Sequence, residues 1–168
     1  MNHTESNLQI QCLRWFRYQY PAYNRLMEHP KNEGDGNRAR GAIAKAEGVQ
    51  PGVADLILHV PAVFHYEENP ETCFFPDIHD YHSLAIEMKT ANGTQSKKQK
   101  EWQQYFEAAG GRYVIVRTFE QFTATVTEYL SNVPTRVHEH IRDLHARLQL
   151  EADMEAKGKF RKLKARQP

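Results

Sequence analysis

The chain has 168 residues, of which 40% are hydrophobic, and its formal net charge is +1. This length and composition suit one compact domain with a real core, and the near-neutral charge excludes a globally basic nucleic-acid binder. Cys12 and Cys73 lack the paired spacing of a disulfide or zinc framework, which favours reduced thiols. The sequence contains no long apolar run and no charged-then-apolar leader, so we expect a cytoplasmic protein without a membrane span.

Apolar side chains at helical spacing predict an amphipathic helix over residues 5–18, and Pro21 ends that pattern. A polar stretch with three glycines, residues 32–41, follows and is typical of a loop. Residues 42–47 then predict a short helix that ends near Gly48. The amino-terminal part is therefore expected to be helical, with one long polar loop.

Two apolar runs, 53–60 and 83–90, predict strands. The connection between them, 61–82, is long for neighbouring strands and contains prolines and several aromatic residues. We therefore expect a hairpin that carries an insertion. A run rich in β-branched residues over 113–117 predicts a further strand.

Two capping-box patterns predict where helices begin. Ser96 with Gln99 begins a helix that continues to a glycine pair at 110–111, and Thr118 with Gln121 begins the next helix. The resulting order is helix, strand, strand, helix, strand, helix. That order predicts an α/β fold in which a mixed central sheet is flanked by helices.

Beyond Pro134 a long helical pattern continues into a basic tail. We treat this part as a C-terminal helical extension that lies outside the core. The expected organisation is therefore a domain over residues 1–131, followed by a helix and basic tail over residues 132–168.

Three ionisable residues lie at the ends of the two predicted apolar strands: Asp55, Glu87 and Lys89. Because side chains alternate along a strand, Glu87 and Lys89 share one face while Met88 points toward the core. Charges in such strands indicate exposure or a functional role, and two acids with a lysine suit metal-assisted cleavage of a phosphodiester bond. The spacing of acid and lysine alone does not establish a catalytic role, because Glu155-Ala156-Lys157 repeats the acid-any-lysine pattern in a polar helical segment.

Four motifs occur in a fixed order along roughly residues 5–130: Gly52-Val53-Ala54-Asp55, Ile86-Glu87-Met88-Lys89, Ser96-Lys97-Lys98-Gln99 with Trp102, and Gly110-Gly111-Arg112-Tyr113-Val114. This combination resembles the VRR-NUC family of the PD-(D/E)xK nuclease superfamily. Ala54 departs from the proline that usually precedes the acid in that family. The resemblance implies a restriction-endonuclease-like core.

By this resemblance Asp55 and Glu87 would bind Mg²⁺ or Mn²⁺, with the backbone carbonyl of Met88 as a further ligand. Lys89 would be the catalytic lysine. Gln99 would face the site from its helix, but it is also the expected partner in a capping box, and the sequence leaves both roles open.

The first helix of the family usually adds an acid, and Glu5 is the best-placed carboxylate there. Contacts with DNA phosphates would come from basic residues on either side of the acidic motifs, namely Arg38, Arg40, Lys45, Lys97, Lys98 and Lys100. A solvated, charged helix face is the alternative for each of these residues.

The resemblance implies a metal-dependent DNA endonuclease that acts as a homodimer on branched DNA such as a Holliday junction, in the cytoplasm of a bacterial or phage-infected cell. The alternatives are a nicking, flap or restriction-type nuclease on duplex DNA and a non-catalytic DNA-binding module with the same fold.

Two further interpretations concern the insertion. It could hold zinc through Cys73, His65, His79 and His82, although their spacing is irregular. It could also, with the last helix, form a dimer surface through Phe64, Tyr66, Phe74 and Phe75.

Overall fold

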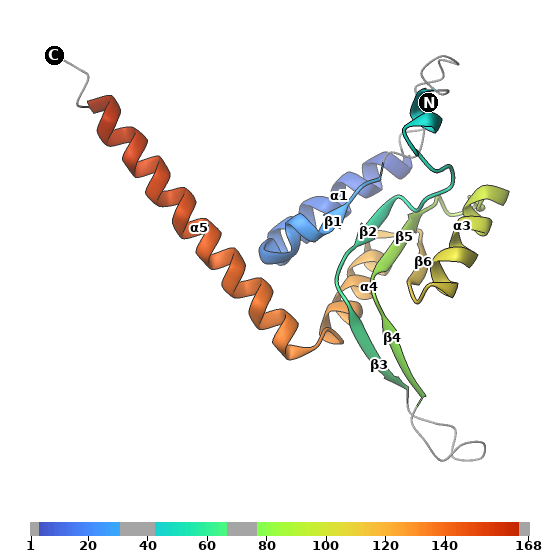
Figure 1. Ribbon diagram of the computed structural model, residues 1–168. Helices are drawn as coiled ribbons and strands as arrows, with labels where there is room; N and C mark the ends of the chain where they lie inside the picture. Colours follow the sequence, from blue (N-terminus) through green and yellow to red (C-terminus); the bar gives the residue numbers. More distant parts are fainter. Residues whose placement is uncertain (1–3, 31–42, 67–76, 165–168) are drawn as a thin grey trace. The chain divides into compact units, whose positions relative to one another are not determined.

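The protein is described by a computed structural model that covers residues 4–30, 43–66 and 77–164 (Figure 1). The predicted glycine-rich loop lies outside these described residues. The chain divides into two compact units, Met1–Val133 and Pro134–Pro168. Among the helices of the described ranges, none combines the length and apolar character that crossing a membrane requires.

A four-stranded mixed sheet forms the centre of the first unit (Figure 1). The strands are β1 (Met27–Glu28), β2 (Leu56–Leu58), β5 (Leu84–Met88) and β6 (Arg112–Val116), in the order β1-β2-β5-β6. β2 pairs antiparallel with β5, whereas β5 pairs parallel with β6. All five residues of β5 are buried, so both faces of the sheet are covered. The mixed sheet predicted from the sequence is confirmed.

Helix α3 (Lys97–Ala108) covers one face of the sheet. Its Trp102 and Phe106 rings stack with centroids 4.8 Å apart and pack against a buried cluster of Ala54, Ile57, Ala85 and Tyr113. The glycine pair after the helix is explained by this packing, because a Cβ at Gly111 would lie 2.2 Å from the Phe106 ring. The helix therefore sits close enough to the sheet for its side chains to reach the strand ends.

Helices α1 (Thr4–Gln19) and α4 (Phe119–Ser131) pack against each other and contact β5 and β6. Trp15 of α1 meets the rings of Phe119 and Phe122 edge to face, with centroids 6.2 and 6.0 Å away. Since α3 covers one face, these two helices cover the other. The residues that alternate onto that face are almost completely buried: Leu56, Leu58, Leu84, Ile86, Met88 and Val116.

The predicted helix starts are observed, with one difference in detail. At α3 the capping box is complete: Ser96 Oγ accepts from Gln99 N, and Gln99 Oε1 accepts from Ser96 N at 2.8 Å. At α4 the Thr118 side chain accepts from Gln121 N as expected, but Gln121 Oε1 accepts from the backbone N of Arg117. In this second pattern the Gln121 side chain therefore accepts from the residue before the N-cap instead of from the N-cap residue Thr118.

The insertion between β2 and β5 contains a second antiparallel pair, β3 (Ala62–Tyr66) and β4 (Asp77–Tyr81). Their register places His65 opposite Ile78 and His79 opposite Phe64. Because opposite residues of an antiparallel pair share a face, His65 and His79 project to opposite faces of this hairpin. The zinc interpretation is wrong for these two histidines, and Cys73 lies outside the described residues.

Phe64 is only 4% exposed, and the Arg112 guanidinium lies 4.3 Å from its ring centroid. It packs against the core, so the expectation that it contributes to a dimer surface is not supported; Phe74 and Phe75 lie outside the described residues.

The second unit consists of α5 (Thr135–Lys164), the predicted C-terminal helix. Several of its large apolar residues are exposed, namely Leu144, Leu148, Leu150 and Met154.

Candidate active site

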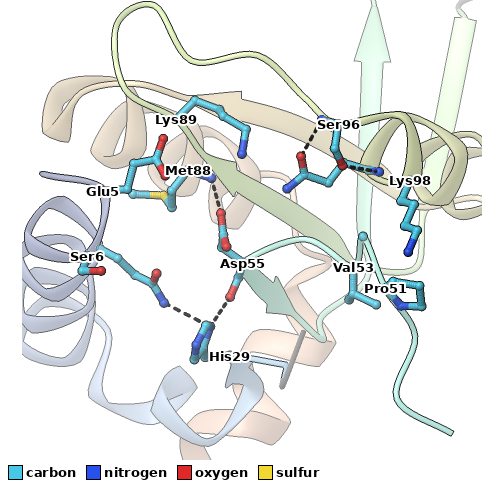
Figure 2. A pocket seen from close by; sticks show the side chains of 13 residues that line it. Glu5, Ser6, His29, Pro51, Val53, Asp55, Met88, Lys89, Ser96 and Lys98 are labelled. Carbon is cyan, nitrogen blue, oxygen red and sulfur yellow. Dashed lines mark hydrogen bonds between the residues drawn. The ribbon is translucent and has the colours of Figure 1, made fainter. Parts of the chain in front are cut away.

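Asp55 and the end of β5 meet across the sheet. Asp55 directly precedes β2, and the antiparallel register that pairs Leu56 with Ile86 brings it opposite Glu87. Its Oδ2 accepts a hydrogen bond of 2.7 Å from the backbone N of Met88, as Figure 2 shows. The two acidic motifs of the sequence are therefore joined by a direct contact.

Glu87 is 0% exposed, and three neighbouring side chains donate hydrogen bonds to its carboxylate. Its Oε1 accepts from Lys89 Nζ at 2.5 Å and from Gln99 Nε2. Its Oε2 accepts from the Tyr113 hydroxyl at 3.1 Å. The predicted alternation of Glu87, Met88 and Lys89 is observed, because the two charged side chains pair while Met88 is buried.

Gln99 performs both roles that the sequence left open. Its Oε1 accepts from the backbone N of Ser96 and closes the capping box, while its Nε2 donates to Glu87 Oε1. One amide has a donor and an acceptor end, so the two roles do not compete. The start of α3 is thereby fixed relative to the buried carboxylate.

Gly52 permits the loop before Asp55 to lie against the start of α3. Its φ is +86°, and a Cβ there would lie 2.5 Å from the carbonyl carbon and oxygen of Lys98. Only glycine combines this backbone conformation with so close an approach. The first motif therefore contributes one residue that permits close packing, Gly52, and one that lines the pocket, Asp55.

A pocket of about 800 Å³ opens beside these residues. Its lining includes two carboxylates, Glu5 and Asp55, together with Lys89, Lys98 and Gln99. Figure 2 shows that α1, the loop before β2, the end of β5 and the start of α3 all contribute to it. Glu87 is not part of the lining, because Lys89 and Gln99 cover it.

His29 also lines the pocket, and the sequence analysis missed it. Its Nδ1 lies 2.6 Å from the backbone oxygen of Asp55, and Gln9 Nε2 lies 3.1 Å from the same nitrogen. Since a carbonyl oxygen only accepts, Nδ1 carries a hydrogen in the shorter contact. His29 follows the two-residue strand β1, which is too short to leave a periodic signal in the sequence.

Burial raises the pKa of Asp55, an effect that the Met88 N–H and Lys89 oppose and that Glu5 reinforces. Burial also raises the pKa of Glu87; the hydrogen bond from Lys89 opposes this shift, and the charge of Asp55 adds to it. The carboxylates therefore repel one another in a partly dehydrated place. A bound cation would relieve that repulsion.

Within the described ranges, no three His, Cys, Asp or Glu residues are grouped closely enough to hold a metal ion by themselves. The donors present are oxygen atoms, which suits a hard cation. Mg²⁺ usually keeps several waters and takes one or two carboxylates. Asp55, Met88 and Glu5 line the pocket, and their carboxylate and carbonyl oxygens fit a cation of that kind, with Glu87 in contact with the lining residues Lys89 and Gln99.

The expected DNA-binding residues are only partly gathered at the pocket. Lys98 lines it, whereas Lys97 and Lys100 are exposed on the same helix. Lys45 is exposed on a helical turn over residues 43–46 and does not line the pocket. Arg38 and Arg40 lie outside the described residues.

The first unit is an α/β fold in which Asp55 and Glu87 lie at the ends of paired strands and Gln99 of the first turn of α3 donates to Glu87. No family model matches the sequence, and no curated protein matches it. A solved structure described as "VRR_NUC domain protein" is similar in fold, with a TM-score of 0.60 and 20% sequence identity, over 77% of this chain and 90% of that chain. The chain therefore has a VRR_NUC fold, and the resemblance seen in its motifs is confirmed at the level of the fold.

Proposed function

We propose that this protein is a metal-dependent DNA endonuclease. The observation that carries the proposal is that Asp55, Lys89 and Gln99 line one pocket of a VRR_NUC fold, and that Lys89 and Gln99 both donate to the buried carboxylate of Glu87. These residues come from two strands and a helix that are separated in sequence. Burial raises the pKa of the Glu87 carboxylate, and ionisable groups with perturbed pKa values cluster at functional sites.

In this proposal Asp55, Glu87 and the Met88 carbonyl hold the cation, and Glu5 assists from α1. Mg²⁺ or Mn²⁺ would neutralise the scissile phosphate and make a water molecule more acidic. Lys89 lines the pocket and is 9% exposed, so its ammonium group can stabilise negative charge that develops on the phosphate oxygens. Gln99 keeps Glu87 in place.

For the substrate we propose branched DNA such as a Holliday junction, cleaved by a homodimer, as in the stand-alone VRR-NUC nucleases that the motifs resemble. Lys98 at the pocket and the exposed Lys97 and Lys100 beside it would contact phosphates without reading base sequence. A nicking, flap or restriction-type activity on duplex DNA is the alternative for the same residues.

The test is cleavage of end-labelled four-way junction, flap and linear duplex DNA in Mg²⁺, Mn²⁺ or EDTA. We expect cleavage that requires a divalent cation, is strongest on the junction and falls roughly 10²-fold to 10³-fold in Lys89→Ala, the usual cost of removing one charge-stabilising donor. Lys157→Ala is the matched control, because Lys157 belongs to the second acid-any-lysine triplet and is exposed on α5.

Three results would change the assignment. Equal cleavage of linear duplex would replace the junction by the alternative substrate. Cleavage that survives Lys89→Ala would remove Lys89 from the mechanism. DNA binding with no cleavage of any substrate would leave a DNA-binding module with this fold.

A further inference from the structure

Tyr113 contacts the buried acid from the neighbouring strand. It lies on β6 opposite Ala85 of β5, on the sheet face that α3 covers, and is 9% exposed. Glu87 is two residues beyond Ala85 on that same face, and the length of the tyrosine ring spans the diagonal. The hydroxyl donates to Glu87 Oε2 at 3.1 Å.

The direction of this hydrogen bond is fixed from the other side. Gln95 Nε2 donates to the Tyr113 oxygen at 3.3 Å and to Gln103 Oε1 at 2.8 Å. Gln103 Nε2 in turn donates to Glu107 Oε1 at 2.9 Å. Because the phenol oxygen accepts from Gln95, its single hydrogen is directed to Glu87.

The two oxygens of Glu87 therefore differ. Oε1 is in contact with Lys89 and Gln99, both of which line the pocket, whereas Oε2 faces Tyr113, which does not. A cation bound in the pocket would therefore reach Glu87 from the Oε1 side, where Lys89 and Gln99 lie. Binding through both oxygens would require the Tyr113 hydrogen bond to break.

Divalent cations differ in how often they coordinate both oxygens of one carboxylate. Ca²⁺ takes six to eight oxygen ligands and often binds a carboxylate through both atoms, whereas Mg²⁺ needs an octahedron and retains several waters. A carboxylate limited to one oxygen favours the smaller ion. Outer contacts of this kind typically change metal affinity by about 10-fold to 100-fold.

We infer that Tyr113 is a positioning residue that holds Glu87 to one coordinating oxygen and thereby makes the site prefer Mg²⁺ and Mn²⁺ over Ca²⁺. The inference rests on the proposed function only in requiring that the pocket binds a divalent cation. Gln95 supports Tyr113 in this role from the loop before α3.

The experiment compares Tyr113→Phe with Tyr129→Phe. Tyr129 is also fully buried, and its hydroxyl donates to the backbone oxygen of Val60 at 2.8 Å, on the opposite face of the sheet. Each substitution removes one buried hydroxyl. The melting temperature of each protein is measured while MgCl₂, MnCl₂ or CaCl₂ is titrated, which reports cation affinity without any reaction.

We expect the ratio of the half-saturating concentrations of Ca²⁺ and Mg²⁺ to fall roughly tenfold in Tyr113→Phe, the low end of the usual effect of such contacts. Tyr129→Phe should keep the wild-type ratio. Gln95→Ala should shift the ratio in the same direction but by a smaller amount. This second variant leaves the Tyr113 ring in the core, so it tests the inference if Tyr113→Phe does not fold.

A wild-type ratio in both Tyr113→Phe and Gln95→Ala would overturn the inference, as would an equal shift in Tyr129→Phe. Failure of the proposed function has a different signature. In that case the wild-type protein shows no melting response to any of the three ions, and the inference falls with it.

Discussion

The carboxylate of Asp55 accepts a hydrogen bond from the backbone N of Met88, with 2.7 Å between Oδ2 and N. Met88 lies between Glu87 and Lys89, so the contact fixes the loop before β2 to the strand end that carries the other two charges. The same side chain lines the pocket. Asp55 therefore has a structural role in addition to the proposed role as a ligand, and substitutions can separate the two.

Asp55→Asn keeps an oxygen that can accept from Met88 N but loses the charge. We expect its melting temperature in EDTA to stay near that of the wild type, while the rise caused by Mg²⁺ or Mn²⁺ disappears. Asp55→Ala should lose the rise and also about 1–3 kcal/mol of stability, because Met88 N is left without its acceptor. Thermal unfolding in EDTA and in each metal measures both effects. A full metal response in Asp55→Asn would exclude Asp55 as a ligand.

Gly52→Ala should damage both stability and activity. The added Cβ would clash with the backbone of Lys98 at the start of α3, and the backbone at Gly52 has a positive φ. Gly48 is the matched control: its φ is +90°, but a Cβ there meets nothing within 4 Å. Gly48→Ala should cost only about 1–2 kcal/mol for the left-handed conformation, and Gly52→Ala clearly more. Equal costs in urea unfolding would show that the loop can move away from α3 freely.

The sequence predicted the placement of those candidate residues whose positions depend on local patterns. Alternation along a strand placed Glu87 and Lys89 on one face, and the capping box placed Gln99 at the first turn of α3. These relations span two or three residues, so they need no knowledge of strand order. The contact between Asp55 and Met88 joins residues 33 positions apart, so it depends on strand pairing, which local patterns do not specify.

The sequence could not predict contacts that depend on register and on short irregular segments. Tyr113 reaches Glu87 because β6 is parallel to β5 in one register, and a shift by one residue would turn its ring to the other face. His29 enters the pocket from a segment without periodicity. The β3–β4 pair lies within the connection 61–82, for which the sequence predicted only an insertion without assigned strands.

Cys12 should be unreactive in the native protein. Burial raises the pKa of its thiol from 9.0 to about 12, and Glu120 adds to the rise. In a Cys73→Ser background, where Cys12 is the remaining cysteine, alkylation at mildly alkaline pH should be negligible until denaturant is added. Rapid labelling under native conditions would contradict the packing of α1.

The raised pKa of Cys12 also makes the free energy of unfolding depend on pH in a definite direction. Below pH 9 the thiol is protonated in both states, whereas between pH 9 and about 12 only the unfolded chain ionises. The unfolded state then binds fewer protons, so the free energy of unfolding falls as pH rises. The stability advantage of Cys73→Ser over the double variant Cys12→Ala/Cys73→Ser should therefore shrink above pH 9 in urea titrations. A constant advantage would mean that Cys12 ionises equally in both states.

Lys98→Ala should weaken junction binding and reduce the slope of log K against log salt by about one, as expected for a single lost phosphate contact. Lys98 lines the pocket, whereas Lys100 is exposed on the same helix outside the lining, so Lys100→Ala should change both quantities less. Fluorescence anisotropy in EDTA, where cleavage is absent, measures them at several salt concentrations. An unchanged slope in Lys98→Ala would assign this lysine to the solvated helix face.

Glu5 connects α1 to the loop that follows β5. Its Oε1 accepts from the backbone N of Thr90 at 2.8 Å, and the same loop is held by Arg117, whose Nη1 donates to the carbonyl oxygen of Gly93 at 2.8 Å. Glu5 also lines the pocket and lies near Asp55, whose pKa it helps to raise. It can therefore act as an anchor for the loop, as a ligand for the cation, or as both.

Glu5→Gln and Glu5→Ala separate these roles. The glutamine can still accept from Thr90 N but has no charge, so a ligand role predicts weaker Mg²⁺ affinity with unchanged stability in EDTA. The alanine removes the acceptor too, and should further lower stability by about 1 kcal/mol. Because Glu5 shares its oxygen with Thr90, we expect the loss of affinity in Glu5→Gln to be smaller than in Asp55→Asn. If Glu5→Gln binds Mg²⁺ as the wild type does while Glu5→Ala is destabilised, Glu5 is an anchor alone, and the ligand set is limited to Asp55, Glu87 and the Met88 carbonyl.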